Sequence, residues 1–174
     1  MATFDGTQLS ARDWAGVGAG AFALVVSFLS WRSVSGPQVV DLANALGLKT
    51  WYTAWGSGVT GWLPIVLLVG AAVLILAPAY GMRVRGVPYL WLAMASVALI
   101  VVIIRWVTLP SPDAALLTAR NIRPEDVDTG ASIGLFLGLA AALISLLGAV
   151  FRVLAAARPA TTEYTQPPPT EQFG

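Results

Sequence analysis

The chain of 174 residues contains no cysteine and no histidine. Without these residues it has no means of forming a disulfide framework, a Cys/His zinc site, a His-ligated haem, a cysteine nucleophile or a histidine-based catalytic triad. The other residues show no catalytic or ligand-binding motif within the secondary structure that such a motif requires. We therefore predict a protein that is not an enzyme and that has no catalytic, metal-binding or cofactor-binding residues.

Charged residues are scarce as well. They make up 11% of the chain, against about 25% in an ordinary soluble domain, while 57% of the residues are hydrophobic and the mean hydropathy is +0.75. Ten basic residues nearly balance nine acidic ones, so there is no surplus of positive charge to hold a nucleic-acid backbone. The composition predicts a membrane protein and excludes nucleic acid as a partner.

A literal match to the dinucleotide-binding pattern G-x-G-x-x-G occurs at residues 56–61. That pattern binds nucleotides when it joins a strand to an amphipathic helix within a βαβ unit. Here a long apolar stretch follows the glycines instead. We interpret them as a flexible turn and predict no nucleotide partner.

Four apolar stretches are long enough to cross a membrane, which takes roughly 20 residues for about 30 Å of hydrocarbon. The spacing predicts an all-α fold, a four-transmembrane-helix bundle within residues 1–157, with spans at about 14–31, 62–80, 89–109 and 131–151. Residues 158–174 contain Pro167-Pro168-Pro169 among polar residues, a composition that does not form a packed core. We predict that they form a disordered cytoplasmic tail.

The orientation depends on the short loop between the second and third spans, which carries Arg83 and Arg85 and no acid. Cytoplasmic loops are enriched in Lys and Arg, so this loop is predicted to face the cytoplasm. The protein is then a multi-pass protein of a bacterial plasma membrane with both termini in the cytoplasm. All seven tryptophans lie near predicted span ends, which favours positions at the level of the lipid headgroups.

The first outer loop holds the most distinctive polar segment. Residues 37–46 are predicted to form a short helix that stops at Gly47, and Trp51, Tyr52 and Trp55 follow it. This segment either lies against its own bundle or offers these aromatic residues as contacts for a partner or for lipid. Arg105 is the only ionisable residue within a span, and it either extends to the outer headgroups or pairs with an acid such as Asp126 or Asp128.

Small residues recur at four-residue spacing in the first and fourth spans: Gly16, Gly20, Gly134, Gly138 and Ala142. Such faces let helix backbones approach closely. They are candidates for packing within the bundle, where the first and fourth spans would meet, or for a face kept for another protein.

The first span ends in Phe28-Leu29-Ser30-Trp31, the outer loop contains Thr53-Ala54-Trp55, and three spans follow the first. This pattern resembles small four-helix integral membrane proteins of actinobacteria, including mycobacteria. Nine Arg to one Lys, with abundant Ala, Val and Gly, fits the high-GC genomes of that group. Ser30 stands where the related pattern has Pro. These proteins mostly lack an assigned function, so the resemblance implies a location and not a mechanism.

Taken together, these features predict a non-catalytic accessory or scaffold subunit of a plasma-membrane or cell-envelope assembly. Its expected partners are membrane lipid and either another membrane protein or further copies of itself. The alternative is a small oligomeric transporter or channel component. Proton-coupled transport is disfavoured because no Asp, Glu, His or Lys lies within the predicted spans.

Overall fold

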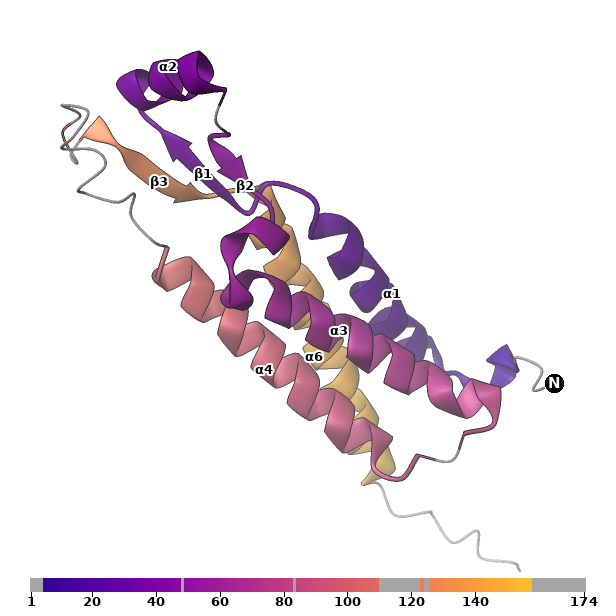
Figure 1. The fold of residues 1–174 in the computed structure, drawn as a ribbon. Coiled ribbons are helices and arrows are strands. Elements are labelled where there is room, and N and C mark those ends of the chain that lie inside the picture. The colour runs from indigo at the N-terminus through magenta and orange to yellow at the C-terminus, as the bar shows by residue number, and fades with distance from the viewer. Residues whose placement is uncertain (1–4, 48, 83, 110–122, 124–125, 158–174) are drawn as a thin grey trace, which may run out of the picture.

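The computed structural model of the protein describes residues 5–47, 49–82, 84–109, 123 and 126–157. The predicted tail at residues 158–174 and Arg83 therefore lie outside the described residues. Within the described part the chain is mostly helical, with four long helices side by side and a small sheet at one end (Figure 1). The long helices are α1 (Ala11–Val26), α3 (Val59–Leu76), α4 (Val87–Val107) and α6 (Ile133–Ala156).

Local signals set the ends of these helices. A capping box starts α1, in which the Ser10 hydroxyl accepts from the backbone N–H of Asp13 and the Asp13 carboxylate accepts from the backbone N–H of Ser10 at 2.8 Å. Pro88 lies in the first turn of α4, where its missing N–H costs nothing. The end of α3 tightens into the 3₁₀ helix η3 (Ala77–Tyr80), which Gly81 terminates in the left-handed conformation.

Among the described residues, three helices are long and apolar enough to cross a membrane: Val59–Tyr80, Val87–Val107 and Ile133–Ala156. The first of these has 22 residues and so extends about 33 Å at 1.5 Å per residue. Helix α1 has 16 residues, or about 24 Å, and ends at Val26 rather than at the expected Trp31. The chain turns after Val26, and this turn brings Trp31 back into the protein core.

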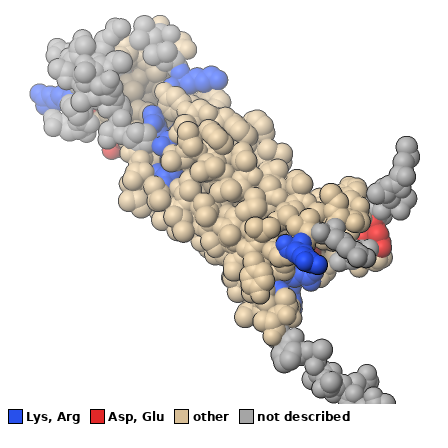
Figure 2. Space-filling model, turned by 60° about the horizontal axis from the view of Figure 1, so that its bottom comes forward, with Lys and Arg blue, Asp and Glu red and all other residues tan. Residues whose placement is uncertain are grey.

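The four long helices form a closed ring in which each helix has two main neighbours. Helix α1 packs against α3 and α6, and α4 packs against the same two helices. The residues in the middle of the bundle are small or aliphatic, as shown by Ala23, Leu68, Ala98 and Ala142. Figure 2 shows that, on the face drawn, charged side chains gather toward the two ends and leave an uncharged belt between them.

The sheet has three short antiparallel strands in the order β2-β1-β3. Strand β1 (Arg32–Ser35) follows α1 and pairs with β2 (Trp51–Tyr52) and with β3 (Asp128–Ala131), which leads into α6. Helix α2 (Pro37–Leu46) joins β1 to β2, and the 3₁₀ helix η2 (Trp55–Ser57) leads into α3. We call these five elements the cap.

The cap confirms one prediction and corrects another. Helix α2 has the predicted bounds and ends at Gly47, whose φ of 64° is the left-handed conformation that favours glycine. The chain is mostly helical, as predicted, but it is not all-α, because the outer segments pair as strands. Their pairing joins Arg32 to Ala131 across almost 100 residues of sequence, so no local hairpin motif predicts this pairing.

The opposite end of the bundle is called the base. It comprises the 3₁₀ helix η1 (Gly6–Gln8), the start of α1, η3, the start of α4 and the end of α6. Both the beginning of α1 and the end of α6 lie at this end of the molecule (Figure 1).

Candidate functional site

Trp31 fills the space beside two glycines of α6. Its side chain is 1% exposed, and a Cβ added at Gly138 would lie 2.9 Å from its ring. A Cβ at Gly134 would lie 2.5 Å from the same ring. The indole N–H donates to the carbonyl of Val26 at 3.0 Å, so the buried donor is satisfied. Trp31 therefore locks the end of α1 against the start of α6.

Trp91 has the equivalent place near the base. Its side chain is fully buried, and its indole N–H donates to the Ser145 hydroxyl at 3.0 Å. A Cβ at Gly148 would lie 3.0 Å from its ring, and one at Gly16 would also collide with it. The glycines of α1 and α6 thus make room for one large side chain from α4.

These contacts change the interpretation of the tryptophans. Trp31 and Trp91 were expected at the headgroup level, but they lie inside the protein, because the glycine faces leave holes of indole size. Helices α1 and α6 pack against each other, but their glycines do not face only one another. Gly20 faces α3, where an added Cβ would lie 2.6 Å from the Ala72 Cβ and 2.7 Å from the Leu68 carbonyl oxygen. Ala142 is fully buried in the bundle core.

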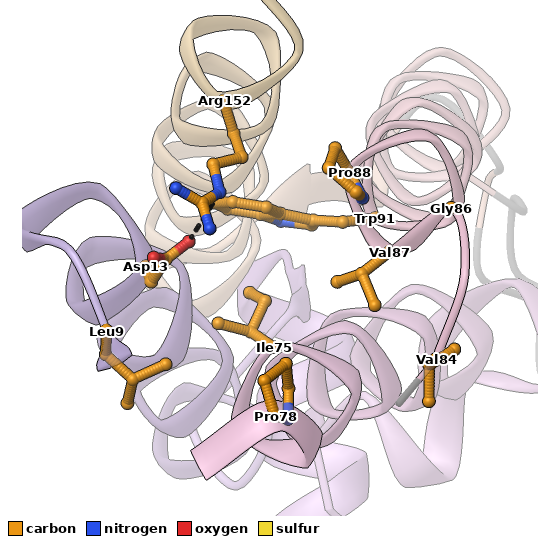
Figure 3. A pocket seen from close by; sticks show the side chains of 10 residues that line it. All are labelled: Leu9, Asp13, Ile75, Pro78, Val84, Gly86, Val87, Pro88, Trp91 and Arg152. Atoms are coloured by element: carbon orange, nitrogen blue, oxygen red, sulfur yellow. Dashed lines mark ion pairs between the residues drawn. The ribbon is translucent and has the colours of Figure 1, made fainter. Parts of the chain in front are cut away.

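A pocket of about 230 Å³ opens at the base (Figure 3). Asp13 of α1 and Arg152 of α6 lie on one side of it, with 3.4 Å between Asp13 Oδ1 and Arg152 Nε. The indole of Trp91 lies next to this ion pair, and mostly apolar side chains complete the lining: Leu9, Ile75, Pro78, Val84, Val87 and Pro88. Asp13 also belongs to the capping box, so its carboxylate has partners on two elements.

The size and chemistry of the base pocket argue against a ligand site. Pockets for organic ligands typically enclose about 300 to 1,000 Å³. The charged groups at this pocket already pair with each other, and the ion pair joins α1 to α6. We therefore interpret the Asp13–Arg152 pair as a structural contact. The sequence did not predict it, because 139 residues separate Asp13 from Arg152.

The predicted aromatic contacts lie together in the cap. Trp51, Tyr52 and Trp55 are 44%, 38% and 43% exposed. Contacts within the protein nevertheless hold each ring, because Lys49 Nζ lies 5.0 Å from the Trp51 ring and Arg32 Cζ lies 4.7 Å from the Tyr52 ring. The Trp55 N–H donates to the Ser27 hydroxyl at 2.9 Å. The cap thus presents ordered aromatic surfaces rather than loose side chains.

Arg105 lies where the bundle meets the cap. It was expected to reach the headgroups or to pair with Asp126 or Asp128, but its side chain is buried, with 8% exposed. Arg105 continues the buried face of α4 formed by Ala98 and Val102. Within the part of the chain that the structure describes, no carboxylate forms an ion pair with Arg105.

Arg32 is the functional candidate that the sequence analysis missed. Its Nε is buried and has no hydrogen-bond partner among the described residues, and its neighbour Trp31 belongs to the same buried cluster as Val102, which lies one turn before Arg105 on α4. Arg32 follows the first apolar stretch directly, so its sequence position resembles that of an ordinary flanking charge. In the structure it lies on the middle strand of the sheet, with its guanidinium over the Tyr52 ring.

Comparisons with models of known protein families, with curated proteins and with solved structures found no match to this chain.

Proposed function

We propose that the protein is a non-catalytic accessory subunit of an envelope assembly, with four membrane-crossing helices and a cap on the outer surface that binds a partner protein. The observation that carries this proposal is the set of ordered, exposed aromatic side chains in the cap. Rigid aromatic residues are the side chains that most often dominate protein interfaces. The cap is also the only described part of the chain that projects well beyond the bundle (Figure 1).

The contacts of α1 support its inclusion as a fourth crossing helix. At the base, Asp13 pairs with Arg152 of α6, and near the cap the backbone carbonyl of Ser27 accepts from the N–H of Ala54 just before α3. Helix α1 and the short turn after it therefore extend over the same height as the three longer helices. With four crossings, both termini lie on one side, and the Arg83 and Arg85 loop favours the cytoplasm for that side.

The packed core favours an accessory role over transport through one bundle. Trp31 and Trp91 fill the interior near the two ends, and alanines and aliphatic residues fill the middle. A water-filled path would need polar residues along the axis, whereas Ser145 is already the acceptor for Trp91. The location of the cap outside the membrane then gives the protein an accessible surface for a partner in the envelope.

The proposal is tested by purifying the tagged full-length protein from its native membrane in mild detergent and quantifying the co-purifying proteins by mass spectrometry. Trp51→Ala removes an exposed cap residue. Trp14→Ala is the matched control, because Trp14 has similar exposure, 49%, and lies at the base. We expect a stoichiometric partner with the wild type and the control, and at least about tenfold lower recovery with Trp51→Ala.

Two results would contradict this function. One is recovery of the chain without a stoichiometric partner. The other is equal recovery of the partner with Trp51→Ala and Trp14→Ala, since the aromatic surface of the cap would then have no part in binding.

A further inference from the structure

Two arginines lie where the cap meets the bundle, and neither forms an ion pair with an acid of the described residues. Arg105 approaches from α4 and is more than nine-tenths buried, while Arg32 approaches from β1 with its Nε enclosed. Trp31, which precedes Arg32, and Val102, one turn before Arg105, belong to one buried cluster, so the two arginines lie at the same end of the bundle. Burial of one unpaired charge is costly, and burial of two neighbouring like charges is costlier still.

None of the carboxylates that the structure describes neutralises these two arginines. Asp126 and Asp128 lie on the same side of the molecule, but both are exposed and neither pairs with Arg105 or Arg32 in the described part of the chain. Among the described residues, the Tyr52 ring is the partner of the Arg32 guanidinium, at 4.7 Å from ring centroid to Cζ. A ring face satisfies part of the charge of a cation and none of its N–H groups.

We propose that Arg32 and Arg105 together bind a phosphate group. A guanidinium presents a planar fork of N–H donors that matches two oxygens of one anion, and two forks from different elements match the several oxygens of a phosphate. A buried orphan donor such as Arg32 Nε is expected where such a ligand belongs. This site is separate from the aromatic surface proposed for the partner, and it is tested separately.

The position of the site allows two sources for the phosphate. Arg105 lies in the last turn of α4, next to Trp106, which is 46% exposed and contacts Phe136 of α6 edge to face. That level corresponds to the end of an apolar helix, where lipid headgroups are found. The phosphate therefore comes either from the headgroup of an anionic lipid or from a free ion on the cap side.

Thermal unfolding of the purified full-length protein in dodecyl maltoside distinguishes these sources. One arm adds phosphatidylglycerol, with the same mole fraction of net-neutral phosphatidylcholine as its reference. The second arm adds inorganic phosphate, with chloride at equal ionic strength as its reference. A ligand that binds only the folded state raises the unfolding midpoint with concentration, and native mass spectrometry of the same samples counts the bound molecules.

The arginine variants provide the decisive comparison. Arg32→Gln and Arg105→Gln are expected to weaken apparent binding of the active probe by at least about tenfold, the loss of one charge-assisted hydrogen bond. Arg85→Gln removes an exposed positive charge near the base and is expected to bind as the wild type does. Arg105→Lys retains the charge without the fork and is expected to bind more weakly than the wild type.

A rise with phosphatidylglycerol alone identifies a lipid headgroup, and a rise with inorganic phosphate alone identifies a soluble ion; both support the site. The proposal is overturned if neither probe raises the midpoint, or if Arg32→Gln responds as strongly as the wild type. Arg32→Gln tests the phosphate site even if the variants of the more deeply buried Arg105 fail to fold, because Arg32 is only partly buried on a cap strand.

Discussion

At the residue scale, the two buried tryptophans occupy space that glycines leave open. Each indole needs both a hole and an acceptor for its N–H, and neighbouring segments of the chain supply both. Trp31 uses the α6 glycines and the Val26 carbonyl, whereas Trp91 uses Gly16, Gly148 and the Ser145 hydroxyl. Trp91 thereby connects α4 to both α1 and α6, and its hydrogen bond fixes the orientation of the ring.

The hydrogen bond of Trp91 gives a specific stability prediction. Ser145→Ala removes the acceptor and leaves a buried N–H unsatisfied, so we expect it to lower the free energy of unfolding by about 1 kcal/mol. Ser96→Ala is the control, because the structure gives the partly buried Ser96 hydroxyl no hydrogen bond within the described residues. Unfolding in detergent, followed by circular dichroism, measures both. Equal effects of the two substitutions would contradict the role of Ser145.

At the scale of the elements, α1 is the helix whose place in the bundle depends most on packing. It is too short to cross about 30 Å of hydrocarbon by itself, and three glycines in its sequence lower its intrinsic helical stability. Gly16 and Gly20 compensate for this by close contact with Trp91 and with α3. Gly18 lies on the other side of the helix, where nothing is within 4 Å of an added Cβ.

The glycines of α1 offer a matched pair of substitutions. Gly20→Ala forces its new methyl group against the backbone of α3 at Leu68, so we expect a loss of about 1–3 kcal/mol in the free energy of unfolding. Gly18→Ala meets open space and is expected to be neutral or stabilising by up to about 1 kcal/mol. The same unfolding assay compares them. A neutral Gly20→Ala would show that α1 does not pack closely on α3.

The helices and strands also show which structural features can be predicted from a single sequence. Helices α3, α4 and α6 follow from long apolar runs, and α2 follows from Pro37 and Gly47, because all these signals are local. The sheet depends on Arg32 meeting Ala131, and such pairing leaves no mark on either segment alone. The burial of Arg105 likewise leaves no mark on the sequence around it.

At the scale of the whole molecule, the bundle and the cap have different tasks in this account. The bundle supplies an apolar body with a filled core, while the cap joins the ends of α1, α3 and α6 and displays the aromatic residues. The backbone N–H of Ser132 donates to the Trp31 carbonyl, and the N–H of Trp31 donates to the Tyr52 carbonyl. These bonds fix the cap to the helices, so a partner bound to the cap would be coupled to the membrane domain.

The orientation of the chain in the membrane underlies every part of the proposed function, and the absence of cysteine makes it simple to measure. Single cysteines are introduced as Ser35→Cys and Asp126→Cys in or beside the cap, and as Thr7→Cys and Ala157→Cys at the base, all at exposed positions. A membrane-impermeant maleimide is added to intact cells. We predict labelling of both cap cysteines, and labelling of both base cysteines only after permeabilisation. Labelling of the base cysteines in intact cells would contradict the account.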